Sequence, residues 1–141
     1  MRFMLMVKGN KVTETGAPPD AALLEAMGKF NEEMIKAGVM LDGAGLQPTS
    51  KGATVKFAAG KRTIVDGPFA ETKEIIAGYW LIQVKSREEA IEWAKRSPNP
   101  MGPDAEAEIE IRQLFETADF EMSPEQRKAF DEMTAKMQAK S

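Results

Sequence analysis

Carboxylates, lysines, arginines and a single tyrosine are the side chains on which any chemistry of this 141-residue chain must depend. The sequence contains no histidine and no cysteine. These absences exclude the usual zinc ligand sets, cysteine nucleophiles, disulfides and an imidazole general base. We therefore expect no bound metal and no cofactor, and the candidate acid and base groups are carboxylates.

The most distinctive segment is the run DGPFAETKE at residues 66–74. Asp66 and Glu71 are its candidate catalytic pair, for general acid and base work. A structural interpretation of Asp66 is stronger, because Asp followed by Gly-Pro builds a turn in which the carboxylate accepts local backbone N–H groups. Phe69 is expected to anchor the loop, with stacking on a ligand as the alternative. Lys73 is a candidate ligand-binding residue, although such loop charges are usually solvated.

A second group of candidates comes from the alternating run IEIR at residues 109–112. Its two isoleucines occupy one face of the predicted strand, so Glu110 and Arg112 point to the other face. In a cavity, Arg112 would bind a carboxylate or phosphate through its planar fork, and Glu110 would have to be paired. At a wet edge, both are ordinary strand charges. Tyr79 is a third candidate, as a hydroxyl donor in the cavity or simply as half-buried core.

The strands that must position these residues are predicted from alternating or continuous apolar runs. They lie at residues 1–8, 39–46, 54–58, 62–65, 78–84 and 106–114. The third and fourth form a hairpin around a short reversal, with Val55 and Phe57 on the inward side. The fifth is the richest in aromatic and branched side chains, and we expect it at the centre of the sheet.

Two helices are predicted from their capping residues. Asp20 is the N-cap of the first, and Gly38 ends it as a left-handed glycine commonly does. Ser86 and Glu89 form a capping box that opens the second, which closes at residues 97–98.

A further helix is predicted after residue 123, where Ser-Pro-Glu-Gln forms a second capping pattern. Its apolar side is a thin stripe of Phe130, Met133 and Met137, and the sequence does not indicate what covers it. We expect this helix to be an appendage of the domain.

The order of these elements predicts an α+β fold with the ferredoxin-like split βαβ layout, an extra hairpin and an appended C-terminal helix. Such a fold packs two helices on one face of an antiparallel sheet. The other face would remain uncovered, and burial against a second copy is the usual solution. We therefore expect a homodimer.

Short sequence segments distributed along the chain indicate one family among those with this fold. Besides DGPF at 66–69, they are KAGV at 36–39, GLQP at 45–48, AIEWA at 90–94 and IEIR at 109–112. Together they resemble the YCII-related (DGPF-motif) domain family. The resemblance covers roughly residues 1–115 and implies a domain over 1–115 followed by a C-terminal helical extension over 116–141.

The resemblance implies a dimeric α+β barrel, in which two sheets close face to face, and a family whose activity is largely undefined. Some members are encoded beside extracytoplasmic-function sigma factors. Two departures are visible: Gln113 stands where members commonly have proline, and the histidine that some relatives carry near the start is missing. A histidine-based mechanism therefore does not transfer to this chain.

Three functions remain open at this stage, and whether the protein is an enzyme is undecided. The favoured function is a small-ligand-binding or sensing homodimer, with an inter-sheet cavity for an anionic or oxygenated ligand lined by Arg112, Glu110, Tyr79 and the Asp66 loop. The alternatives are a cofactor-independent isomerase or lyase that uses the loop carboxylates, and an accessory interaction module of a sigma-factor regulatory system with a regulatory protein partner.

Charge and hydropathy exclude other classes of partner. The net charge is −3 with both signs interspersed, so there is no basic stripe for nucleic acid. No apolar run of membrane-spanning length occurs, and the apolar start is too short for a signal peptide. We expect no membrane partner and a cytoplasmic location.

Overall fold

A four-stranded antiparallel sheet carries most of the candidate residues. Its strands are β1 (Arg2–Lys8), β2 (Met40–Gly45), β5 (Ile76–Gln83) and β6 (Ile109–Gln113). The structure, a computed structural model, describes residues 1–69 and 74–139. The strand order is β2-β5-β1-β6, so β5 and β1 are central. This order is that of the ferredoxin-like split βαβ fold and confirms the predicted architecture.

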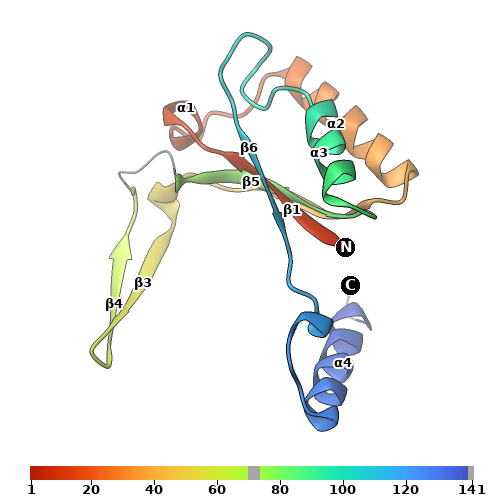
Figure 1. Cartoon of the computed structure of the whole chain (residues 1–141). Helices are drawn as coiled ribbons and strands as arrows, with labels where there is room; N and C mark the ends of the chain where they lie inside the picture. Colours follow the sequence, from red (N-terminus) through yellow and green to blue (C-terminus); the bar gives the residue numbers. More distant parts are fainter. Residues whose placement is uncertain (70–73, 140–141) are drawn as a thin grey trace.

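Two helices cover one face of the sheet (Figure 1). They are α2 (Ala21–Lys36) and α3 (Arg87–Arg96). The Asp20 carboxylate and the Ser86 hydroxyl accept hydrogen bonds from backbone N–H groups one turn on, at 2.8 and 3.1 Å, as predicted. The Glu89 carboxylate reaches back to the N–H of Lys85, one residue before the cap. Gly38, with φ of 73°, follows the end of α2.

The core fills the space between these helices and the sheet. The rings of Phe30 and Trp80 meet edge to face at 5.4 Å, and the Trp80 indole N–H donates to Asn31 Oδ1 at 2.8 Å. Buried core residues are Phe3, Leu5, Val7, Phe30, Met34, Val39, Trp80, Ile82, Val84, Ala90 and Trp93. Those from β1 and β5 all point to the helix-covered face, because side chains alternate along a strand.

The predicted hairpin is confirmed, but it forms a sheet of its own. Its strands are β3 (Ala53–Ala58) and β4 (Lys61–Asp66), joined by Ala59 and Gly60 with φ of 49° and 76°. Two consecutive positive φ angles are typical of the type I′ turn of tight hairpins. The prediction that Val55 and Phe57 point inward is wrong, because both are exposed. The hairpin projects away from the four-stranded sheet, so no described element covers them (Figure 1).

Two short elements lie in segments that the sequence indicates only as loops. The helix α1 (Lys11–Glu14) is capped by Asn10, whose Oδ1 accepts from the N–H of Thr13 at 3.0 Å. The 3-10 turn η1 (Thr49–Lys51) precedes the hairpin. Elements of three or four residues are too short to show a hydrophobic period, which explains why the pattern does not reveal them.

The C-terminal segment extends from the far end of β6. It contains the 3-10 turn η3 (Thr117–Asp119) and the predicted helix α4 (Pro124–Ala139). Ser123 and Gln126 form the expected reciprocal cap, at 3.0 and 3.1 Å. None of the residues of α4 is buried. Among the residues that the structure describes, no helix is long and apolar enough to cross a membrane.

Candidate functional site

The sheet face opposite the helices, here called the open face, brings three of the candidate residues together. Strand register aligns Tyr79 and Glu110 on either side of Met6, and Leu81 and Arg112 on either side of Met4. The open face thus has an apolar centre with polar groups at both sides. Its residues are Met4, Met6, Lys8, Asp42, Tyr79, Leu81, Glu110 and Arg112.

Glu110 lies between two cations on this face. The Lys8 ammonium is 3.2 Å from Glu110 Oε1, and Arg112 Nε is 3.9 Å from Glu110 Oε2. The second distance is too long for a hydrogen bond, so the Arg112 fork is not committed to Glu110. The Arg112 side chain is 74% exposed, against 38% for Glu110. The three formal charges sum to +1, and Asp42 brings the formal charge of the open face to zero.

Tyr79 acts as a hydrogen-bond donor on the same face. Its hydroxyl donates to Asp42 Oδ2 at 3.3 Å, and Asp42 Oδ1 in turn accepts from the N–H of Gly43 at 2.8 Å. The negative charge of Asp42, with some desolvation and this hydrogen bond, raises the pKa of the Tyr79 hydroxyl. A raised pKa keeps the phenol protonated at neutral pH, so Tyr79 is a poor base. Because its one O–H is donated to Asp42, its oxygen can accept a hydrogen bond from a ligand.

The DGPF segment occupies a different part of the molecule, at the root of the hairpin. Asp66 is the last residue of β4, pairs with Ala53 and is exposed. The N–H of Gly67 donates to the carbonyl of Gly52 at 3.0 Å. Phe69 is half-buried. The backbone bond from Gly67 to Gly52 fastens the base of the hairpin.

A carboxylate that the sequence does not single out supports this root. Glu14 accepts two hydrogen bonds from Thr49, one from its backbone N–H at 3.2 Å and one from its hydroxyl. The Thr49 hydroxyl oxygen in turn accepts from the N–H of Phe69 at 3.0 Å. A relay therefore runs from α1 through η1 to the motif. Its members are 35 and 20 residues apart, and no sequence pattern signals contacts at such separations.

Gly67 has no room for a side chain. A Cβ atom built there would lie 1.7 Å from the carbonyl oxygen of Thr49 and 2.5 Å from its carbonyl carbon. Both are backbone atoms, which cannot rotate away. The glycine of the motif is thus required by the close approach of two backbone segments.

The candidate residues of the sequence therefore fall into two groups. Tyr79, Glu110 and Arg112 share the open face of the four-stranded sheet, whereas Asp66 belongs to the separate hairpin sheet. Phe69 follows Asp66 at the hairpin root. The remaining two candidates, Glu71 and Lys73, lie outside the described residues.

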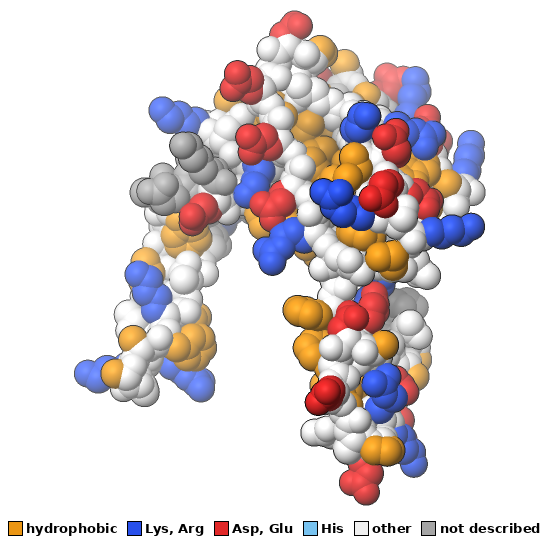
Figure 2. Space-filling view, viewed as in Figure 1, with side chains coloured by type: hydrophobic (Ala, Val, Ile, Leu, Met, Phe, Trp, Pro, Cys, Tyr) orange, Lys and Arg blue, Asp and Glu red, His pale blue; other side chains and the backbone are white. Residues whose placement is uncertain are grey.

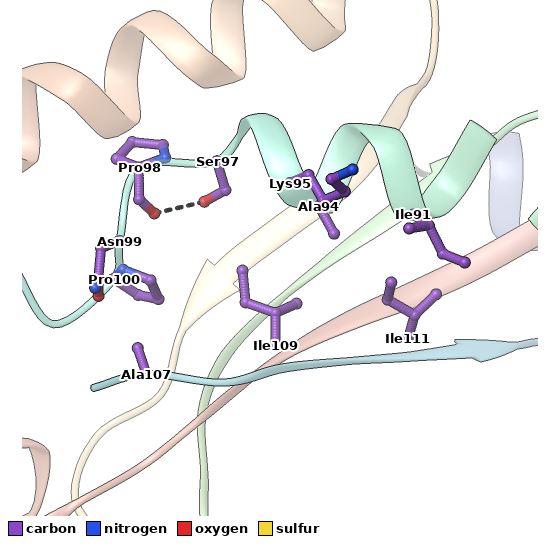
Figure 3. A pocket seen from close by; sticks show the side chains of 10 residues that line it. All are labelled: Ile91, Ala94, Lys95, Ser97, Pro98, Asn99, Pro100, Ala107, Ile109 and Ile111. Carbon is purple, nitrogen blue, oxygen red and sulfur yellow. Dashed lines mark hydrogen bonds between the residues drawn. The ribbon is translucent and has the colours of Figure 1, made fainter. Parts of the chain in front are cut away.

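A groove on the helix-covered side holds no comparable constellation (Figure 3). It measures about 370 Å³ and lies between α3 and β6. Ile91 and Ile111 point toward one another across it, beside Ala94 and Ile109. Lys95 is its one titratable side chain among the described residues. Across the described part of the chain, no cluster of three or more aspartates and glutamates could hold a metal ion.

Comparison with known proteins supplies a family but no reaction. The model of the YCII-related domain family matches residues 1–116. An uncharacterised protein of Rhizobium meliloti (strain 1021) is 35% identical over 80 residues, which are 57% of this chain. The match spans 64% of that protein, so this chain covers less than two thirds of its relative.

Proposed function

Because the chain belongs to the YCII-related domain family, whose model matches most of it, we propose that it is a homodimer that binds a small anionic or oxygenated ligand. The two copies bring their open faces together and enclose a cavity between them. Ligand binding in this cavity serves sensing or carriage and needs no nucleophile.

The observation that carries the proposal is the uncovered open face, on which the Arg112 fork is not hydrogen-bonded to Glu110. The helices α2 and α3 cover one sheet face, whereas no described helix or strand of the chain covers the other. A sheet this wide with Met4, Met6 and Leu81 at its centre is normally buried against something. Burial would strip water from Arg112 and strengthen its attraction for a carboxylate or phosphate.

Each polar group of the face has a distinct part in binding. Arg112 presents its fork to two oxygens of the ligand. Tyr79 donates its O–H to Asp42 and offers its oxygen as an acceptor to a hydroxyl group of the ligand. Glu110 holds Lys8 and limits the positive charge left in the empty cavity.

The test combines anion affinity and stability in matched variants. Arg112→Leu should weaken binding of inorganic phosphate and succinate about tenfold or more, because a charged hydrogen bond contributes about 1.5–3 kcal/mol. Calorimetric titration measures the affinity. Arg87→Leu, an exposed arginine on the helix layer, is the control and should bind as the unaltered chain does.

Adding Glu110→Gln separates a ligand-binding role of Arg112 from a structural one. If Arg112 mainly neutralises Glu110, the single variant melts at a lower temperature and the double variant recovers. If Arg112 binds ligand, affinity falls without a change in melting temperature. Equal affinity in the unaltered chain and both variants would remove Arg112 from the site.

The enzyme alternative has less support. It needs a carboxylate base facing Arg112 in a dry site, but Asp66 is exposed and belongs to the other sheet. An isomerase or lyase role would therefore depend on Glu71, or on residues that a second copy supplies.

A further inference from the structure

The hairpin, here called the arm (residues 53–66), has one apolar face that nothing in the described chain covers. Cross-strand pairing puts Val55 with Ile64 and Phe57 with Arg62 on this face. Phe57 is 70% exposed and Ile64 is 69% exposed. An isolated two-stranded hairpin is at best marginally stable in water. The arm therefore needs a surface on which to pack.

The C-terminal segment, here called the tail (residues 114–139), offers such a surface. A groove of about 860 Å³ runs between η3, α4 and one end of the four-stranded sheet. Its apolar lining residues are Leu41, Phe115, Phe120, Met122 and Phe130. Four of these are large side chains left exposed, with Phe115 at 74%. A helix without buried residues, such as α4, also lacks the packing that normally stabilises a helix.

The two surfaces carry opposite charge. The arm has Lys56, Lys61 and Arg62 against Asp66, which gives a net charge of +2; Arg62 lies on the apolar face, and Lys56 and Lys61 lie on the opposite face. The tail has six acidic and three basic residues, which gives −3; these are Glu116, Asp119, Glu121, Glu125, Asp131 and Glu132 against Arg127, Lys128 and Lys136. Three of the acidic residues, Glu116, Glu121 and Asp131, line the groove, and Glu116 is paired with Arg2. Opposite charge steers association and fixes its register.

Within one copy the arm cannot reach the groove. The tail leaves the sheet where the N–H of Leu114 donates to the carbonyl of Arg2, at the beginning of β1. The arm is rooted beyond the other end, where the N–H of Leu46 donates to the carbonyl of Ala77. The length of β1 alone separates these ends by about 20 Å. Figure 2 shows the arm and the tail as separate projections, each bearing hydrophobic side chains.

A two-fold axis resolves this separation. If two open faces meet around an axis that runs across the strands, the opposite ends of the two sheets coincide. The arm of each copy then lies over the groove of the other. Because the contact is made twice, a modest interaction at each end adds to the contact between the sheets.

We propose that the apolar face of each arm docks into the tail groove of a second copy, with Arg62 beside Glu121 and Asp131. This inference rests on the homodimer of the proposed function. The docked arm closes one end of the partner's cavity, so the ligand site is incomplete in a single copy. It also gives Phe130 of α4 a buried place in the dimer.

Cross-linking tests the contact directly, because the natural chain has no cysteine. Phe57→Cys is prepared in one batch and Phe130→Cys in another, and the mixed dimers are treated with a short bis-maleimide. We expect a cross-linked pair that contains one chain of each kind. The control mixes Phe57→Cys with Ile35→Cys, whose residue is as exposed but lies on the helix layer. This control should give no cross-link.

The other outcomes are equally decisive. Cross-links only between two Phe57→Cys chains would show arm-to-arm packing and overturn the proposal. Equal cross-linking in the control would show random collision and also overturn it. Sedimentation of the unaltered chain separates the two levels: a dimer without the arm–tail cross-link defeats this inference alone, whereas a monomer defeats the homodimer as well.

Charge reversal provides an independent measurement. Arg62→Glu on the arm, or Glu121→Lys with Asp131→Lys on the tail, should each raise the dimer dissociation constant at least about tenfold. In a mixed dimer of the two reversed proteins, the reversed arm of one chain meets the reversed tail of the other. The natural arm meets the natural tail, so both contacts are attractive and affinity should be restored. Mixtures that associate no better than the separate variants would contradict the docking.

Discussion

At the scale of single residues, Gly67 shows how the motif is constrained by backbone contact. We expect Gly67→Ala to destabilise the protein by about 1–3 kcal/mol or more, since neither backbone segment can yield without breaking the hairpin root. Urea titration measures the loss. Gly45→Ala is the matched control, because a Cβ there meets nothing within 4 Å. If both variants were equally stable, the close approach to Thr49 would be refuted.

Thr49 is the second residue at the hairpin root whose substitution should lower the stability of the protein. Thr49→Val keeps the shape but removes the hydroxyl that links Glu14 to the N–H of Phe69. We expect a loss of about 1–2 kcal/mol, because water can partly replace bonds among half-buried groups. Thr63→Val, an exposed threonine on the arm, should change stability by less than about 0.5 kcal/mol. Chemical denaturation of both variants compares them, and similar values would make the relay unimportant.

Sequence patterns predict the position of a side chain where that position is determined by neighbouring residues, and not where it depends on contacts between distant segments. Alternation is a property of neighbouring residues, so it correctly separates Glu110 and Arg112 from the isoleucines beside them. The relay from Glu14 to Thr49 depends on how α1 and η1 meet after folding, and spacing along the chain carries no trace of it. The same holds for the bond from Tyr79 to Asp42.

At the scale of elements, the tail is attached to the sheet by one ion pair with two hydrogen bonds. Arg2 donates from Nε and Nη2 to the two carboxylate oxygens of Glu116, at 2.8 and 3.0 Å. These hydrogen bonds, and secondarily the positive charge, hold the pKa of Glu116 below its ordinary value of 4.5. A lowered pKa means that the pair stabilises the folded state above about pH 4.5 and ceases to do so as pH falls through the lowered value.

We therefore expect Glu116→Gln to cost at most about 1 kcal/mol at pH 7, since both side chains are partly exposed. At pH 3 the difference from the unaltered chain should shrink, because protonated Glu116 resembles glutamine. Urea titrations at the two pH values provide the measurement, with Glu125→Gln on the exposed first turn of α4 as control. A difference that stays constant with pH would mean that the ion pair does not stabilise the tail.

The hairpin shows which property of an element a sequence pattern cannot predict. Alternation correctly predicts that Val55 and Phe57 share a face, and the two-residue turn is marked by glycine. It cannot predict whether a covering surface belongs to the same chain. The helices were predictable because caps are local, whereas the partner of an apolar face is decided by tertiary or quaternary packing.

At the scale of the whole molecule, the two faces of the sheet have different roles. The covered face accounts for the stability of the fold, and the open face is available for association. All residues of the main hydrophobic cluster lie between the sheet and the two helices, so a single copy has a core of its own, and Met6 on the open face is buried in addition. Association then involves the open face, the arm and the tail. A change confined to the tail should consequently affect the dimer far more than the fold, and truncation tests this separation.

Deleting residues after Phe120 removes α4 and the groove residues Met122 and Phe130 but retains Glu116 and its bond to Arg2. Because none of the removed residues that the structure describes is buried, the truncated chain should keep its circular dichroism, apart from the lost helix, and unfold cooperatively. Its dimer dissociation constant should rise, since each arm loses its docking surface. Loss of cooperative unfolding at a concentration where the unaltered chain is monomeric would show that the tail covers core. A dimer as tight as before would show that association depends on the open face alone.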